Sequence, residues 1–264
     1  MWFSLFYQPL VNALIFSYNL LGGSLGWAII GLTVAIRLIL TPLTLPSLKS
    51  AQKLKELQPE LAKLKEKFGG DKQAWAKKQL EFYQSRGVNP AAGCLPQIVQ
   101  IVILIALFQA FNQVLTQNGN VAEGLNKILY SPLQLSSDAV INNRFAYLNL
   151  TQPDLFTIPA IKLFGFTLDK FPGIFLLLAA VTQFISSKLM LPAVNKAKAV
   201  AEKTKGQSDD MAAAMQKQML YLMPLMTLFI GFKFASGLVL YWLTFSAIML
   251  VQQLLLNNGQ TKKT

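Results

Sequence analysis

The sequence has no histidine and only one cysteine, Cys94. Histidine is the commonest metal ligand and general base, and a single cysteine excludes an intrachain disulfide and a thiolate metal cluster. Acidic residues are also scarce, since 12 of them stand against 24 lysines and arginines, and none falls in a long apolar run. An intramembrane protease would need a serine with a base, or a pair of membrane aspartates. We therefore expect no metal, no cofactor and no enzymatic activity.

Charge as a whole is sparse, at 14% of the residues, whereas soluble domains carry about a quarter. Hydrophobic residues make up 53% of the chain, and the mean hydropathy is +0.41. These values predict a polytopic membrane protein that has the lipid bilayer as a partner. The net charge of +12 would suggest nucleic acid in a soluble protein. Because the basic residues lie between the apolar runs, we expect no direct sequence-specific nucleic-acid binding.

Apolar runs of roughly 20 residues, long enough to cross a bilayer as a helix, recur along the chain. They predict an all-α polytopic membrane protein with a five-span core, a cytoplasmic helical hairpin and an N-terminal interfacial helix. A sixth, partial span within residues 1–22 is the alternative to the interfacial helix. The predicted segments are 1–22, the interfacial amphipathic helix; 23–46, span 1; 47–90, the cytoplasmic helical hairpin; 91–116, span 2; 117–171, an extracytoplasmic loop; 172–191, span 3; 192–216, a cytoplasmic loop; 217–233, span 4; 234–257, span 5; and 258–264, a short cytoplasmic tail.

The distribution of lysine and arginine predicts the orientation. Basic residues outnumber acidic ones in segments 46–90 and 188–217, whereas segment 116–171 carries both signs equally. Cytoplasmic loops of membrane proteins are enriched in basic residues, so the first two segments are expected inside and the third outside. The chain is thus predicted to be an integral protein of the prokaryotic cytoplasmic membrane, with its N-terminus outside and its C-terminus in the cytoplasm.

Arg37 is the only charged residue within residues 25–45. An arginine at the centre of a span costs about 2.5–3.5 kcal/mol on insertion scales, so such a residue usually faces a wet cavity or a partner. The apolar runs offer it no carboxylate, so a counter-ion would come from a ligand, a lipid headgroup or a passing polypeptide. The alternative is an arginine that snorkels to the membrane interface.

Other polar side chains recur in the apolar runs. Thr33, Thr41 and Thr44 share a helix face with Arg37 at three- and four-residue steps. Each polar residue alone is also typical of an ordinary hydrogen bond between membrane helices. Together they predict a polar cavity open to the cytoplasm, which we call the groove. The predicted groove residues are Arg37, Thr33, Thr41, Gln97, Gln100, Gln183, Ser186, Trp242 and Ser246.

The first basic loop shows helical periodicity. Apolar residues recur every three or four positions from Leu48 to Phe68, Gly69 and Gly70 then end the helix, and a second helix over residues 71–84 can return antiparallel. Pro59 either bends the first arm or starts a new helix. The hairpin is either a solvated linker or a basic surface for anionic lipid, RNA or an acidic partner.

Several motifs occur together in a fixed order. They are IRLILTPLTLPSLKSAQKLKELQPELAKLKEKFGGDKQ, then GVNPAAGCLPQIVQIVILIALFQAF, then MPLMTLFIGFKFASGLVLYW, and the closing VQQ. Over nearly its whole length the chain resembles the YidC family of membrane-protein insertases, with their mitochondrial Oxa and chloroplast Alb relatives. It resembles the short form, which lacks a large extracytoplasmic domain.

The resemblance implies a membrane-protein insertase and chaperone. Such a protein moves short hydrophilic tails of client proteins through the groove and releases their apolar segments laterally into the bilayer. Arg37, Gln183 and Trp242 match groove-lining positions of the family, and residues 47–90 match a hairpin that accepts substrates. The implied partners are nascent membrane proteins, the ribosome, the signal recognition particle and its receptor, and the general secretion channel. A small-anion transporter or channel is the alternative, because a membrane arginine among polar helix faces can also bind an anion.

Overall fold

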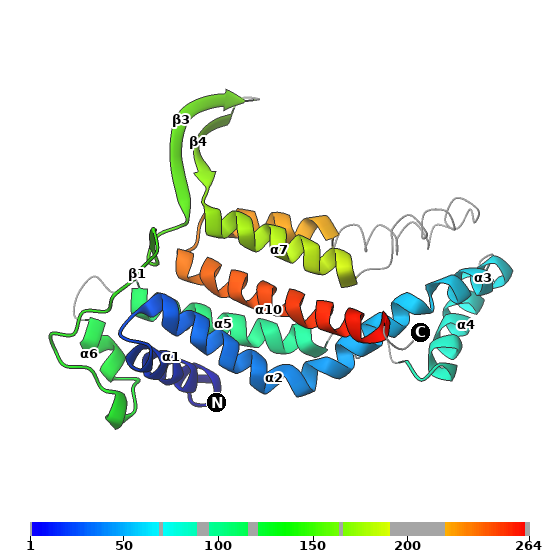
Figure 1. Cartoon of the computed structure of the whole chain (residues 1–264), viewed down its shortest axis with the longest axis horizontal. Helices are drawn as coiled ribbons and strands as arrows, with labels where there is room; N and C mark the ends of the chain where they lie inside the picture. The colour runs from blue at the N-terminus through cyan, green and yellow to red at the C-terminus, as the bar shows by residue number, and fades with distance from the viewer. Residues whose placement is uncertain are drawn as a thin grey trace. The chain divides into compact units, whose positions relative to one another are not determined.

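The computed structural model describes residues 2–68, 71–88, 95–115, 121–163, 166–190 and 220–261. These residues are mostly helical, as expected for a helical membrane protein (Figure 1). They fall into two compact units, of which the first comprises residues 1–39, 99–182 and 225–248 and the second comprises residues 40–98, 183–224 and 249–264. Each unit is described by itself below.

The elements follow one another along the chain as η1 (Phe3–Tyr7), α1 (Gln8–Leu20), α2 (Leu25–Glu56), α3 (Gln58–Phe68), α4 (Lys72–Ser85), α5 (Leu95–Leu115), α6 (Val121–Asn126), η3 (Ser131–Leu133), β1 (Arg144–Phe145), β2 (Leu148–Asn149), β3 (Leu155–Leu163), β4 (Phe166–Pro172), α7 (Ile174–Met190) and α10 (Ser236–Thr261). A further apolar helix, Leu220–Gly231, lies between α7 and α10 in the sequence.

Among the described residues, two stretches of helix are long and apolar enough to cross a bilayer, Leu25–Leu54 in α2 and Ser236–Leu256 in α10. The first begins after Gly22 and Gly23, whose positive φ angles of 77° and 69° form the turn from α1. It then continues through Pro42 and Pro46 to Glu56, beyond residue 46, where the sequence predicted the span to end. Membrane helices tolerate internal prolines, because neighbouring groups satisfy the carbonyl that proline leaves without a donor.

The core of the first unit is built from α1, α2, α5, α10 and residues 121–154, which contain α6, β1 and β2. We call residues 121–154 the outer segment, because the sequence predicts that they lie outside the membrane. α1 buries Val11, Leu14 and Ile15 in this core, so residues predicted to form an interfacial helix also pack inside the unit. Asn12 ties α1 to the outer segment, since its Nδ2 donates to the carbonyl of Ile128 over 3.2 Å and its Oδ1 accepts from the amide of Tyr130 over 2.7 Å.

The outer segment also satisfies the exposed amides that begin two long helices. The carbonyl of Asn142 accepts from the amide of Leu25, at the start of α2, over 3.1 Å. The carbonyl of Gln152 accepts from the amide of Ser236, at the start of α10, over 2.7 Å. Residues 142–154 are therefore a structural part of the first unit, a role that the sequence did not assign to the extracytoplasmic loop.

Two antiparallel β-hairpins within this loop were not predicted. β1 pairs with β2, and β3 pairs with β4 from the Leu155–Pro172 pair to the Leu163–Phe166 pair, with an irregularity between Thr157 and Ile161. The alternation of apolar and polar residues is interrupted there by Pro159, which cannot donate to a ladder. The chain is accordingly helical in the main, with these hairpins as an addition.

In the second unit, α3 and α4 pack together around Leu61, Trp75 and Tyr83. α2 ends at Glu56 and α3 begins at Gln58, next to Pro59, so a new helix starts there rather than a bent one continuing. Asp71 caps α4 by accepting hydrogen bonds from the amides of Gln73 and Ala74 over 2.9 and 3.2 Å. Gly69 and Gly70 lie outside the described residues.

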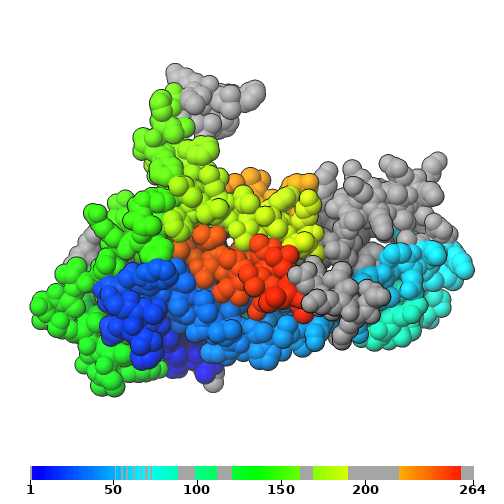
Figure 2. Space-filling model, viewed as in Figure 1, coloured from blue at the N-terminus to red at the C-terminus, as the bar shows by residue number. Residues whose placement is uncertain are grey.

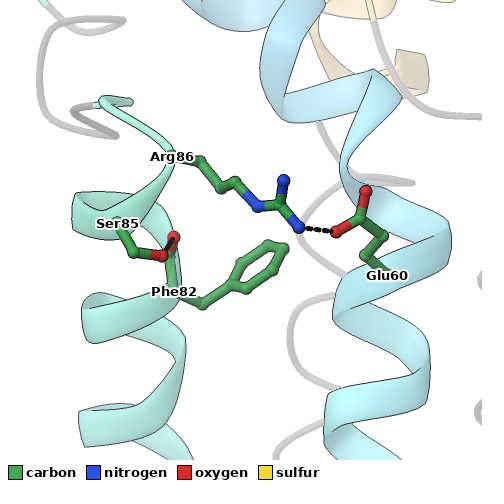
Figure 3. A network of polar contacts seen from close by, with 4 residues as sticks. All are labelled: Glu60, Phe82, Ser85 and Arg86. Carbon is green, nitrogen blue, oxygen red and sulfur yellow. Dashed lines mark hydrogen bonds and ion pairs between the residues drawn. The ribbon is translucent and has the colours of Figure 1, made fainter.

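An ion pair joins α3 and the end of α4. The guanidinium of Arg86 donates to the carboxylate of Glu60 and lies 5.6 Å from the ring centroid of Phe82, and Ser85 Oγ donates to the Phe82 carbonyl over 2.8 Å (Figure 3). Both charged side chains are half exposed, so we expect the pair to contribute only about 0.2–1 kcal/mol.

Candidate functional site

Arg37 is a buried cation in α2. Only 5% of its surface is exposed, and Thr33, one turn earlier on the same helix face, is 2% exposed. Thr33 Oγ1 donates to the carbonyl of Ile29 over 2.6 Å, so its hydroxyl is satisfied within its own helix. Thr33 and Arg37 are therefore both buried on one face of α2.

α10 supplies the aromatic side chains around this cation. The guanidinium carbon of Arg37 lies 4.1 Å from the ring centroid of Phe245, within the range of a cation–π interaction. Tyr241 is 2% exposed and lies one turn before Phe245, with the two ring centroids 6.1 Å apart. Ser246 is buried, and Trp242 packs, partly buried, against the core of the first unit.

Gln100 brings a polar group of α5 to the same part of the first unit. Its side-chain Nε2 donates a hydrogen bond to the hydroxyl of Tyr241. Tyr241 thereby has Phe245 on one side and an amide from another helix on the other. The first unit therefore links α2 to α10 through Arg37 and Phe245, and α10 to α5 through Tyr241 and Gln100.

The second unit contains a separate polar cluster. Gln252 Nε2, on α10, donates to Thr41 Oγ1, on α2, over 2.9 Å. Thr44 Oγ1 donates to the carbonyl of Thr41 over 3.2 Å. Gln253, next to Gln252, is 6% exposed, so two adjacent glutamines place amides among buried side chains.

Some buried acceptors of the second unit lack a donor among the residues that the structure describes. They are Oγ of Ser186, on α7, and the side-chain Oε1 atoms of Gln252 and Gln253. A buried polar atom left unsatisfied costs about 1–3 kcal/mol, so such atoms normally bind water or a ligand. Gln183, one turn before Ser186 on α7, is partly buried and has polar or ring contacts of its own.

The structure thus divides the predicted groove residues between the two units. Thr33, Arg37, Gln100, Trp242 and Ser246 belong to the first unit, whereas Thr41, Gln183 and Ser186 belong to the second. The side chain of Gln97 lies outside the described part of the structure.

Sequence reasoning missed Tyr241, Phe245, Gln252 and Gln253. The first two read as ordinary apolar residues of a span, although their four-residue spacing places them on one helix face. The glutamines were visible in the closing VQQ motif, but without a known neighbour they had no assigned role.

The chemistry of these clusters is that of binding. Across the described ranges no group of three or more histidine, cysteine, aspartate or glutamate side chains is placed to hold a metal ion. The groups present are one guanidinium, hydroxyls and amides, which can attract an anion and exchange hydrogen bonds with a polar chain.

Comparison with known proteins identifies the family. Residues 16–264 match the family described as "60Kd inner membrane protein". A protein of Fusobacterium nucleatum named "Membrane protein insertase YidC" is 34% identical over 231 residues, which cover 88% of this chain and 85% of that protein. "Membrane protein insertase YidC 2" of Bacillus anthracis is 30% identical, covering 99% of this chain and 83% of the relative. The relative from Roseobacter denitrificans is 33% identical over 99% of this chain, which spans only 38% of that longer protein.

These matches agree with the motif order in the sequence and with the apolar helices of the fold. They also place the protein in the cytoplasmic membrane, in agreement with its composition. The chain belongs to the 60Kd inner membrane protein family, the family of the YidC insertases.

Proposed function

We propose that this chain is a membrane-protein insertase and chaperone. In this proposal, short hydrophilic tails of client proteins pass through a polar groove open to the cytoplasm, and the apolar segments of the clients leave sideways into the bilayer. The observation that carries the proposal is Arg37, a buried cation in an apolar helix that lies against Phe245 of α10, one turn from the Tyr241 hydroxyl that accepts from the Gln100 amide. The relatives named as insertases support the same assignment.

The groove lowers the free-energy cost of moving a hydrophilic tail across the membrane, and it forms or breaks no covalent bond. Hydrocarbon about 30 Å thick opposes a hydrophilic tail, because each unsatisfied backbone group costs several kcal/mol there. Thr33 and Gln100 in the first unit would offer hydrogen bonds over part of that distance, and so would Thr41, Gln183 and Ser186 in the second unit. The buried acceptors of Ser186, Gln252 and Gln253 support this role, because they can bind water or the amides of a passing tail.

Arg37 supplies attraction for acidic residues of the client. At about 4 Å and an effective dielectric near 20, opposite charges attract by about 4 kcal/mol before desolvation is subtracted. This attraction is small enough for release of the tail. A membrane potential adds about 2.3 kcal/mol per charge per 100 mV, and it drives acidic residues outward.

Apolar client segments would leave along helices whose own side chains face outward. In helix Leu220–Gly231, Leu225 and Phe229 are each 61% exposed, and Met223 and Met226 are also exposed. Methionine adapts its shape to varied apolar partners. α5 offers a similar surface at Ile101 and Ile105.

The proposed orientation places the N-terminus outside and the α3–α4 hairpin in the cytoplasm. The hairpin has a small core of its own around Trp75 and a surface rich in lysine. We infer that it receives clients, either directly or from the ribosome, the signal recognition particle and its receptor, or the secretion channel.

The test is insertion by the purified full-length chain. Vesicles that contain the protein should insert a purified single-span client with an acidic outer tail, without ribosomes, and protect that tail from external protease. Empty vesicles give the background. Saturable anion flux in the absence of a client, together with background insertion, would instead identify a small-anion transporter.

A further inference from the structure

The β3–β4 hairpin is fastened to the beginning of α7. The hydroxyl of Tyr147 donates to Asp154 Oδ1 over 2.7 Å and accepts from the amide of Ile174 over 2.8 Å. Asp154 Oδ2 accepts from the amide of Leu176 over 2.8 Å, and its side chain is 2% exposed. A Cβ atom on Gly173 would lie 1.7 Å from Asp154 Oδ1, so only glycine fits between the strand and the helix. The base of the hairpin is therefore held firmly at the first turn of α7.

From this fixed base the hairpin extends across the direction of the helices. In Figure 1, β3 and β4 leave the first turn of α7 and point sideways from the helices of the same unit, and Figure 2 shows them standing clear of those helices. If α7 crosses the membrane, a hairpin that extends in this direction runs along the membrane surface. An isolated two-stranded hairpin is marginally stable in water, so this one needs support from its surroundings.

The base of the hairpin exposes aromatic side chains. We define the outer aromatic patch as Tyr147, Phe156, Phe171 and Ile174, which are 46%, 41%, 50% and 53% exposed. Phe156 pairs directly with Phe171 across the strands. Tyr147 stacks on Phe156 with the ring centroids 5.5 Å apart. Large apolar groups gathered at the end of an apolar helix are typical of the membrane–water interface, where aromatic rings concentrate.

The patch continues an apolar stripe on α7. Leu178 and Val181 follow Ile174 at four- and three-residue steps on one helix face, and they are 47% and 52% exposed. In a membrane protein this stripe is suited to lipid. The outer aromatic patch lies directly beyond the N-terminal end of this stripe. The polar Thr157–Lys170 pair is on the opposite face of the hairpin base.

We propose that the outer aromatic patch inserts into the headgroup layer of the bilayer at the N-terminal end of α7, and that the β3–β4 hairpin lies along that surface as an interfacial anchor. The Asp154–Tyr147 clamp transmits this anchoring to α7 and sets the depth of the helix in the membrane. This inference depends on α7 spanning the membrane. It does not depend on the proposed binding of clients at α2 and α10.

The test uses the full-length protein in lipid vesicles and needs no insertion assay. In a Cys94→Ser background, Phe156→Cys and Phe171→Cys are labelled with bimane, and Asp138→Cys, an exposed polar position of the same outer segment, is the matched control. The fluorescence is quenched either by lipids with a nitroxide near the headgroup or by iodide present on both sides of the bilayer. We expect the ratio of lipid quenching to iodide quenching to be several-fold higher at 156 and 171 than at 138. Equal ratios at all three positions would overturn the proposal.

A second measurement leaves the patch unaltered. Tyr130 and Tyr147 have nearly equal exposed fractions in the protein, 45% and 46%. Hydroxyl-radical oxidation of the unmodified protein in vesicles should therefore proceed at similar rates at both tyrosines unless lipid covers one of them. We expect Tyr147 to be oxidised several-fold more slowly than Tyr130. Similar oxidation rates would overturn the proposal, because they would show that lipid does not cover Tyr147.

Discussion

The guanidinium of Arg37 lies 4.1 Å from the ring centroid of Phe245. A cation–π contact of this kind stabilises a desolvated cation by about 2 kcal/mol. A carboxylate partner would cancel the charge, whereas an aromatic ring holds the guanidinium in place without neutralising it. The proposed function requires the positive charge of Arg37 to attract an anionic segment of the client.

Replacing Arg37 tests the role of this charge. We expect Arg37→Ala to fold but to reduce insertion of clients with acidic outer tails several-fold, because the electrostatic attraction is lost. Arg37→Lys should retain much of the activity if charge matters more than the guanidinium shape. Insertion of a client with a neutral tail is the internal control. Equal insertion of acidic-tailed clients by the unmodified chain and by Arg37→Ala would refute the role.

The Gln100–Tyr241 hydrogen bond tests whether α5 and α10 are coupled within the first unit. Tyr241→Phe leaves the Gln100 amide without its acceptor, which should lower the free energy of unfolding by about 0.5–1.5 kcal/mol. Gln100→Leu should have a similar effect, and the double variant should cost less than the sum of the two single changes. Thermal unfolding in detergent measures all three. Strictly additive losses would show that the two side chains do not interact.

Cysteine accessibility tests the groove itself. In the Cys94→Ser background, single cysteines are introduced at Thr33, Gln97, Gln100, Gln183, Ser186 and Trp242, and a membrane-impermeant thiol reagent is added from the cytoplasmic side. We expect several of these positions to react because they line water. A cysteine at Leu178, on the exposed apolar stripe of α7, is the control and should not react. If none of the six positions reacts, these side chains only join helices.

The α3–α4 hairpin should move as a unit relative to the spans. Its own packing rests on a small cluster around Trp75 and on the exposed Arg86–Glu60 pair. Hydrogen exchange should therefore be fast in α3 and α4 and slow in α2 and α10. Replacement of residues 70–84 by a short Gly/Ser linker should leave the spans assembled and reduce insertion. A hairpin as protected as the spans, or unchanged insertion after the deletion, would make it a passive connector.

The sequence was sufficient for the family and the membrane class, because apolar runs and the order of several motifs are local properties of the chain. Packing between distant residues was not predictable in the same way. From the sequence, Phe245 is an ordinary lipid-facing or core residue, and only the position of α2 shows its contact with Arg37. Asp154 is likewise an ordinary loop residue in the sequence, whereas in the structure it caps α7. The β3–β4 hairpin escaped prediction because Pro159 interrupts its alternation. α2 passes through Pro42 and Pro46, which in a soluble helix would mark its end.

The clamp at the base of the β3–β4 hairpin predicts a pH dependence. Burial, and then the hydrogen bond to Asp154, raises the pKa of Tyr147 above its usual value of 10.0. The folded protein therefore favours the protonated phenol. The stabilisation is fully present below the pKa of the unfolded chain and is lost as the pH rises through the higher pKa of the folded state. Between about pH 9 and pH 11, stability should fall more steeply for the unmodified chain than for Tyr147→Phe, which cannot ionise.

The same variant separates this effect from the titration of other side chains. Tyr147→Phe keeps the ring that stacks on Phe156 but removes the hydroxyl that joins Asp154 to the amide of Ile174. At neutral pH it should already be less stable by about 1–3 kcal/mol, because the buried Asp154 loses a hydrogen bond. Thermal unfolding of both proteins at about pH 9 and pH 11 gives the slope of stability against pH for each. Lysines and the other tyrosines contribute equally to the two slopes. Parallel slopes would show that Tyr147 does not couple the outer segment to α7.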